Sequence, residues 1–348
     1  MNETDYRIRR LRTVVLIALV AAVFAGLIYS RFKAYSLAPN LKPADFHGLP
    51  LWYIPVAYIL DYVSHGWICL LFAFVTAGLI YEFIPKDVIN RYMSSGKASG
   101  YALAVGVAPF LTVCSCTMIP LFSGILYAGA GIGPAIAFML MAPAANMLTI
   151  LLTGEFLSWQ IAIVRIFTSL VTAIAAGLII SHTPWGRKTE NAHKIDVNDS
   201  HQSSTSMVTM PLDDKLLSAL RFAAYLGRQI LPFFFLGLIV VSYVEAFLPE
   251  GLVANYLTGI RGILLASVIG GPLYTPTLVE IVLGRSLLNL GMSQAALLSW
   301  LMGQPYDVPN MMAASKIVKW KLVASYALVA WAFSVIFGLS YGVALGKL

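Results

Sequence analysis

The chain has 348 residues, of which 59% are hydrophobic and 11% are charged, and its mean hydropathy is +0.80. Because a soluble domain usually carries ~25% charged residues, this composition excludes an ordinary soluble protein and predicts an all-α polytopic membrane protein. The net charge of +7 does not indicate nucleic-acid binding, since the basic residues stand in short clusters beside apolar segments, as in the positive-inside pattern. The length allows about eight or nine membrane passages or half-passages.

Residues 1–50 predict a tail, a first membrane span and an external loop. Four arginines within residues 1–12 precede an apolar run at 13–29, which Arg31 and Lys33 close. A signal peptide also has a basic start and an apolar run, but no small-x-small cleavage site follows cleanly here. We therefore expect an uncleaved span with a cytoplasmic N-terminus.

The first membrane repeat is expected at 51–182, and its organising stretch is 98–130. This stretch is apolar but is interrupted by Pro109, Pro120 and a Cys-Ser-Cys segment at 114–116. Since one helix of roughly 20 apolar residues crosses the hydrocarbon core, the interrupted stretch predicts two half-helices that meet at a non-helical tip. Backbone that leaves the helix at membrane depth must be buried in protein or line a cavity, so this tip is the first candidate site.

The rest of this repeat comprises a long span, a basic amphipathic segment, a span with Pro143 and Asn146 at its middle, and a span that contains Arg165. These segments cover 52–84, 86–97, 132–153 and 158–182. A polar linker rich in Ser, Thr and Asp follows at 183–215. Its composition is typical of a loosely folded segment, which we place in the cytoplasm.

The second membrane repeat, 216–348, presents the same order of segments about 160 residues later. A long span again ends in a motif with Glu and Pro, and a broken stretch returns at 261–290 with Gly-Pro-Leu-Tyr-Thr-Pro at its tip. Residues 291–312 then echo 131–147. Each match is short, but the shared order predicts an internal duplication.

Charge predicts how the two repeats lie in the membrane. If both broken stretches crossed it fully, the basic linker would fall outside, against the positive-inside rule. If both are re-entrant hairpins, the N-terminus, the linker and Lys316, Lys319 and Lys321 are all cytoplasmic. The second repeat then runs upside down relative to the first, which is the inverted-repeat plan of many secondary transporters.

The thiols of Cys114 and Cys116 would lie on one side of an extended tip. Two thiols there would hold a soft, thiophilic species. The alternatives are that each Cys is a small buried hydrophobe or that the two form a strained disulfide. Cys69 stands alone in a span and is expected in the core.

Polar side chains at membrane depth supply further candidates. An intramembrane acid is costly to bury and is a functional hypothesis by default, so Asp307 and Glu280 are predicted proton-coupling residues. The alternative for Asp307 is a neutral side chain that hydrogen-bonds broken backbone. Arg165 would either pair with an acid or extend toward the membrane surface. The predicted substrate contacts beside the two thiols are Ser115, Asn146, Tyr274, Thr275 and Asn310.

Motifs of several other function classes are missing from the sequence. It has no P-loop, G-x-S-x-G or H-E-x-x-H pattern, and its five histidines lack metal-site spacing. We therefore predict no catalytic residue, metal or cofactor, and we expect that the protein is not an enzyme.

The sequence VCSCTMIPL at 113–121, followed after a Gly-rich turn by APAANM at 142–147, resembles the ArsP-type permeases. The second half, with Gly-Pro-Leu-Tyr-Thr-Pro and a Pro-x-Asp-x-Pro-Asn element, is similar to the same family, and the likeness covers roughly 55–345. Members of that family are linked to efflux of trivalent organoarsenicals, and relatives to other metalloids, so the resemblance implies a permease whose thiols meet a thiophilic substrate, without fixing which one. It also implies a binding role for Cys114 and Cys116, and for Asn146.

These observations favour a secondary exporter in the bacterial inner membrane, in which an organoarsenical such as methylarsenite bonds reversibly to thiolate and proton antiport drives export. Three alternatives stay open. They are a permease for another metalloid, metal cation or small sulfur compound; an intramembrane thiol oxidoreductase that uses Cys114 and Cys116; and a membrane subunit whose activity lies in a partner. The sequence sets no oligomeric state.

Overall fold

The computed structural model describes residues 3–37, 50–111, 117–192, 211–246, 257–271, 277–303 and 306–346. In these ranges the regular secondary structure is helical, with no strand. Six segments are long and apolar enough to cross a membrane. The prediction of an all-α polytopic membrane protein is therefore confirmed in its class. The six segments are Arg10–Ser30, Gly66–Phe83, Ile132–Phe156, Trp159–His182, Leu212–Tyr243 and Trp320–Ala344.

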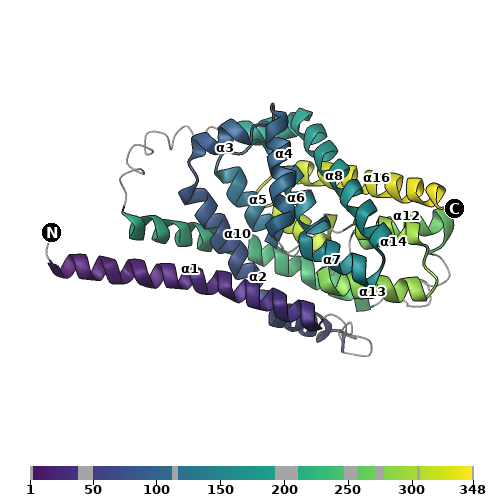
Figure 1. Ribbon diagram of the computed structural model, residues 1–348, viewed down its shortest axis with the longest axis horizontal. Helices are drawn as coiled ribbons and strands as arrows, with labels where there is room; N and C mark the ends of the chain where they lie inside the picture. The colour runs from purple at the N-terminus through teal and green to yellow at the C-terminus, as the bar shows by residue number, and fades with distance from the viewer. Residues whose placement is uncertain are drawn as a thin grey trace.

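The helices follow one another in the order shown in Figure 1. After α1 (Glu3–Leu37), the first half contains α2 (Ile54–Phe83), α3 (Lys86–Tyr92), α4 (Ala98–Val107), the 3₁₀ turn η2 (Ala108–Leu111), α5 (Met118–Tyr127), α6 (Ile132–Ala144), α7 (Met147–Phe156) and α8 (Trp159–His182). The second half contains α10 (Leu212–Ala246), α12 (Gly259–Gly270), α13 (Thr277–Asn289), α14 (Gln294–Leu301), α15 (Val308–Ala314) and α16 (Trp320–Ala344).

Both broken stretches consist of short helices, as predicted. Helices α4 and α5 have 10 residues each, and at 1.5 Å per residue each is ~15 Å long, about half the hydrocarbon thickness. In the second half, α12 and α13 have 12 and 13 residues. The tips themselves, 112–116 and 272–276, lie outside the described residues.

One turn has the same geometry in both halves. The α5–α6 and α13–α14 connections each place a glycine at positive φ, 102° at Gly129 and 103° at Gly291, where a side chain would be strained. Two residues after each glycine, the N–H of Gly131 or Ser293 donates to a carbonyl of the loop before the broken stretch. The two positive-φ glycines are 162 residues apart, close to the offset of about 160 residues that the sequence suggests.

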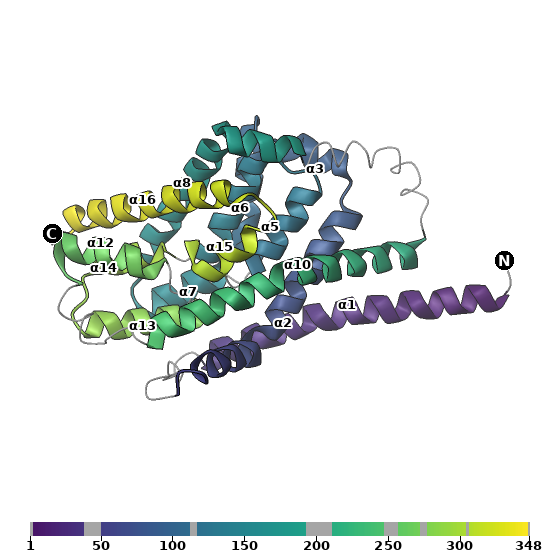
Figure 2. The ribbon, with the colours of Figure 1, turned by 180° about the vertical axis from the view of Figure 1, so that it is seen from behind.

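Close backbone packing holds the bundle together. A Cβ added at Gly78 of α2 would lie 2.1 Å from the carbonyl oxygen of Ala219 on α10, so these two long helices are in direct backbone contact. All 13 residues of α6 are buried, as expected for a helix that is apolar on every side. Helix α1 runs beside α10 on the periphery (Figure 2), where Arg12 pairs with Asp213 and Asp214 at 3.6 and 3.5 Å.

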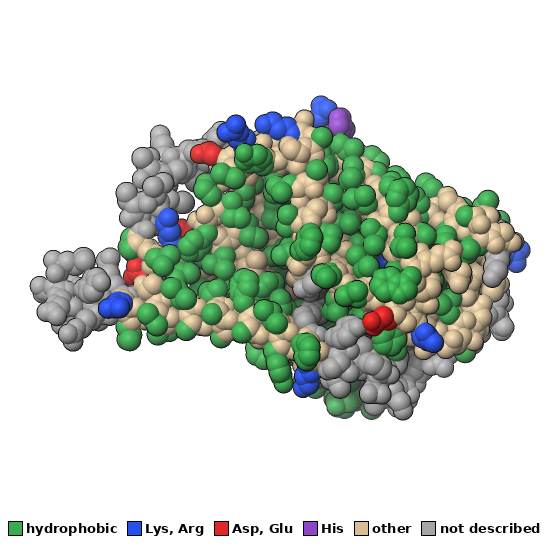
Figure 3. Space-filling view, in the orientation of Figure 1, with side chains coloured by type: hydrophobic (Ala, Val, Ile, Leu, Met, Phe, Trp, Pro, Cys, Tyr) green, Lys and Arg blue, Asp and Glu red, His purple; other side chains and the backbone are tan. Residues whose placement is uncertain are grey.

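The molecular surface has the character of a membrane protein. In Figure 3 hydrophobic side chains cover the middle of the face, and Lys and Arg lie mainly at its margins. The marked N- and C-termini lie at opposite ends of the long axis (Figure 1).

Candidate functional site

The first candidate site is the break between α6 and α7. Pro143 lies in the last turn of α6, and Asn146 caps the N-terminus of α7. The Asn146 side chain spans the interruption: its Nδ2 donates to the Ala142 carbonyl at 3.2 Å, and its Oδ1 accepts from the Thr149 N–H at 2.9 Å. Helix ends leave such backbone groups without partners, so one amide side chain stabilises both sides of the break.

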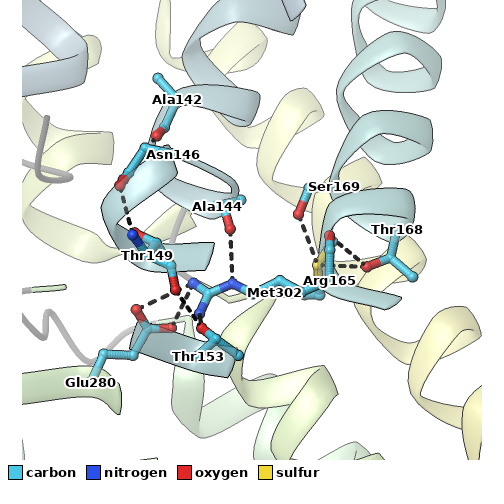
Figure 4. Close-up of polar contacts among 10 residues, drawn as sticks. All are labelled: Ala142, Ala144, Asn146, Thr149, Thr153, Arg165, Thr168, Ser169, Glu280 and Met302. Atoms are coloured by element: carbon cyan, nitrogen blue, oxygen red, sulfur yellow. Dashed lines mark hydrogen bonds and ion pairs between the residues drawn. The ribbon is translucent and has the colours of Figure 1, made fainter. Parts of the chain in front are cut away.

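Arg165 of α8 joins this break to the other half of the protein (Figure 4). Its Nε donates to the carbonyl of Ala144 at 2.8 Å and one terminal nitrogen to Thr153 Oγ1 at 3.3 Å. The other terminal nitrogen donates to both carboxylate oxygens of Glu280 on α13, at 3.1 and 3.3 Å. The exposed fractions of the Arg165 and Glu280 side chains are 0% and 1%. Of the two predictions for Arg165, pairing with an acid is therefore confirmed.

A sulfur atom also lies at the contact between the halves. The thioether of Met302, just after α14, accepts from the hydroxyls of Thr168 and Ser169 on α8 at 3.3 and 3.6 Å (Figure 4). Met302 is buried. The sequence offered no clear signal for this contact, because a Met in an apolar span is ordinarily read as core packing.

The second candidate site is the break between α14 and α15, where Asp307 caps α15. One Asp307 carboxylate oxygen accepts from the backbone N–H of Asn310 at 2.8 Å, and the other accepts from Asn310 Nδ2 at 2.6 Å. Both side chains are fully buried. The other side-chain oxygen of this pair, Asn310 Oδ1, is buried without a hydrogen-bond partner among the described residues, and so is the hydroxyl of Tyr326 on α16.

Helix α12 packs directly on this second break. A Cβ added at Gly303 would lie 2.6 Å from the carbonyl carbon of Gly270, the last residue of α12. Tyr306 donates from its hydroxyl to the carbonyl of Ser267 at 3.1 Å. The described end of α12, immediately before the 272–276 tip, therefore lies against the α14–α15 break.

The structure brings some predicted residues together and leaves others undescribed. Asn146 and Glu280 both belong to the network around Arg165, and Asp307 and Asn310 form the second site. Cys114, Ser115, Cys116, Tyr274 and Thr275 lie outside the described residues. Cys69 is buried in the core, as predicted. Within the described part of the chain, no group of three or more His, Cys, Asp or Glu side chains is placed to hold a metal.

Sequence reasoning missed Thr153 and Tyr326. Thr153 also donates to the Thr149 carbonyl at 2.6 Å, a bond that Thr makes in many helices and that carries no functional signal. Tyr326 stands in an apolar span, where a tyrosine gives no signal until its neighbours in space are known.

Long apolar helices, several of them interrupted, with an ion pair buried between the two halves of the chain, define a polytopic membrane protein. The family described as ArsP_1, a predicted permease, matches residues 56–343, and the chain belongs to that family.

Relatives extend over most of the chain. It is 28% identical over 345 residues to the UPF0718 protein MJ0584 of Methanocaldococcus jannaschii, an alignment covering 82% of this chain and 94% of the relative. It is 23% identical over 312 residues to the UPF0718 protein YraQ of Escherichia coli, covering 84% and 85%. A Streptococcus mutans protein, named as a putative two-component membrane permease complex subunit, is 21% identical over 127 residues, covering 36% of this chain and 42% of the relative. No solved structure matches the chain.

Proposed function

We propose that this permease exports trivalent organoarsenicals, such as methylarsenite, by secondary active transport. The observation that carries the transport part is the Arg165–Glu280 pair, buried between the two halves at 3.1 Å. Charged groups at membrane depth are costly, and such residues are by default functional candidates that mark substrate, ion or proton pathways. Membership of a predicted-permease family supports the same conclusion.

The substrate part of the proposal comes from the Cys114-Ser115-Cys116 tip and the family resemblance. Trivalent arsenic is a soft centre and forms exchangeable bonds with thiolate, as soft ligands favour. The two thiols would displace the two hydroxyl groups of methylarsenite, which leave as water with the thiol protons while two As–S bonds form. Hydrolysis reverses this exchange, so weak binding would permit release. Asn146, Tyr274, Thr275 and Asn310 are the proposed polar neighbours of the bound substrate.

Glu280 is the proposed carrier of a coupling proton. Arg165 is the charged group that faces Glu280 among the described residues. Protonation of Glu280 would remove the negative charge that holds the guanidinium, and so would weaken the link between α8 and α13. The two halves, arranged as inverted repeats with re-entrant hairpins and a cytoplasmic N-terminus, would then exchange access between the two sides. The proton role of Asp307 stays a prediction.

Transport into proteoliposomes tests the proposal. Accumulation of methylarsenite is compared with that of arsenite, with and without a proton gradient, for the wild type, Cys116→Ala and the matched control Cys69→Ala. We expect gradient-dependent accumulation of methylarsenite that is lost in Cys116→Ala and kept in Cys69→Ala. Accumulation that persists in Cys116→Ala would contradict the thiol mechanism, and transport of arsenite alone would indicate a different substrate. Accumulation independent of the gradient would contradict the role of Glu280.

A further inference from the structure

The α14–α15 break contains a buried carboxylate that has no cationic partner among the described residues. Asp307 is 0% exposed, and within the described part of the chain its two oxygens accept from the backbone and the side-chain amide of Asn310. Among the described residues, no Lys, Arg or His lies within ion-pair distance of Asp307. Burial of an uncompensated charge is far more costly than burial of a paired one, so the missing positive charge requires an explanation.

Corresponding helix positions in the two halves carry different charges. Arg165 is the seventh residue of α8, which begins at Trp159, and Tyr326 is the seventh residue of α16, which begins at Trp320. Likewise Asn146 caps α7 and Asp307 caps α15. The second half therefore has an acid where the first has an amide, and a neutral tyrosine where the first has an arginine.

Two buried oxygens of this region have no hydrogen-bond partner among the described residues. Asn310 lies against Asp307, and its Oδ1 accepts no hydrogen bond there. The hydroxyl of Tyr326, on the α16 helix that follows α15, is the other. Buried polar atoms ordinarily have partners. A proton on Asp307 would serve at most one of these oxygens, whereas a metal cation accepts electron pairs from all of them.

We propose that Asp307, Asn310 and Tyr326 form a sodium-binding site. Carboxylate, amide and hydroxyl oxygens are hard ligands that suit alkali and alkaline-earth cations and disfavour soft metals. One carboxylate balances the charge of a monovalent ion, while a divalent ion would leave a net positive charge in a dry site. The close backbone packing around the break, with Pro309 against Gly237 and Gly303 against Gly270, favours a small ion. Bound sodium would supply beside the second break a positive charge such as Arg165, at the helix position that corresponds to Tyr326, supplies beside the first.

Sodium binding is tested on the purified full-length protein in detergent, without any arsenical, so its failure is separate from failure of the substrate proposal. Thermal unfolding is followed while NaCl replaces choline chloride or KCl at constant ionic strength and fixed pH. We expect a saturable rise in melting temperature with Na⁺ only. The Asp307→Asn variant keeps a capping oxygen, as Asn146 does in the first half, and is expected to lose the rise. Tyr326→Phe should weaken the apparent affinity by ~10-fold or more.

The matched control is Asp87→Asn, which removes an exposed carboxylate in the first turn of α3 and should leave the sodium response unchanged. If Asp307→Asn does not fold, sodium binding is measured directly as binding of radioactive ²²Na⁺ to the wild type. Excess unlabelled Na⁺ should displace the bound ²²Na⁺, and excess K⁺ should not. An equal response to K⁺ or choline, or a sodium response that survives in Asp307→Asn, would overturn the proposal.

Discussion

The α6–α7 and α14–α15 breaks are both capped by a side chain, but the two capping side chains differ in charge. In both, a side chain at the N-cap accepts from the N–H three residues later, Asn146 from Thr149 and Asp307 from Asn310. The first break is neutral at its cap and has a complete ion pair beside it. The second carries an acid at its cap, with no described basic partner. Capping alone accepts either Asn or Asp, so helix formation does not determine which of the two stands at each break.

The comparison distinguishes a structural contact between the two halves, at the first break, from the proposed ion site at the second. At the first break, the bonds of Arg165 run to α7, to the end of α6 and to α13, so the break is fixed to both halves. At the second, the polar bonds of Asp307 are local and two neighbouring oxygens are left unpaired. We expect substitutions at the first break to reduce stability most, and substitutions at the second to alter ion binding more than stability.

Arg165→Met has the largest expected effect. It leaves the Glu280 carboxylate buried and unpaired, and breaking a buried pair in this way costs ~3–5 kcal/mol. Unfolding in SDS or by heat would measure the loss. The exposed Arg187→Met serves as control and should change stability by less than ~0.5 kcal/mol. In the double variant Arg165→Met/Glu280→Gln much of the loss should be recovered, and a double variant as unstable as the single one would argue against the pair.

Asn146→Ala is expected to have the next largest effect. It removes the partners of the Ala142 carbonyl and the Thr149 N–H, and leaving two buried backbone groups unsatisfied costs roughly 2–3 kcal/mol. The same unfolding assay applies. A change below ~0.5 kcal/mol would mean that water replaces the side chain and that the first break is wetter than its burial indicates.

Gly303→Ala tests the packing of α12 on the α14–α15 break. The new methyl group would lie 2.6 Å from the Gly270 backbone, and forcing the segments apart should cost about 1–3 kcal/mol. Gly106→Ala is the matched control, because nothing lies within 4 Å of its added Cβ. In α4 that control should stabilise by up to ~1 kcal/mol through helix propensity. Equal melting temperatures for the two variants would contradict the close contact.

Asp307→Asn has the smallest expected effect on stability, below ~1 kcal/mol. The capping oxygen is retained, and the Asn310 amide can turn so that its unpaired oxygen accepts from the amide that the substitution introduces. Unfolding is measured here in choline chloride, where no sodium effect is present. A loss of ~3 kcal/mol or more, as expected for Arg165→Met, would show that Asp307 has a structural partner and would end the contrast between the breaks.

The interrupted helices could be predicted from the sequence because Pro and Gly mark them within long apolar runs. The internal duplication stays a prediction, which the matching positive-φ turns at Gly129 and Gly291 support. The pairing of Arg165 with Glu280 could not be assigned, since 115 residues separate them and only the packing of α7 on both α8 and α13 brings this acid, among those available, to the arginine. The absence of a described cation beside Asp307 likewise depends on how helices distant in the sequence pack together, which the sequence does not show. The roles proposed for Cys114 and Cys116 rest on the sequence alone.

The most direct test of the central claim is protection of the tip thiols by substrate. In membranes containing Cys69→Ala protein, Cys114 and Cys116 are labelled with a maleimide in the presence of methylarsenite or of pentavalent methylarsonate, and the labelled peptides are quantified by mass spectrometry. The account predicts that methylarsenite suppresses labelling of both residues and that methylarsonate does not. Labelling that is unchanged by methylarsenite would contradict it.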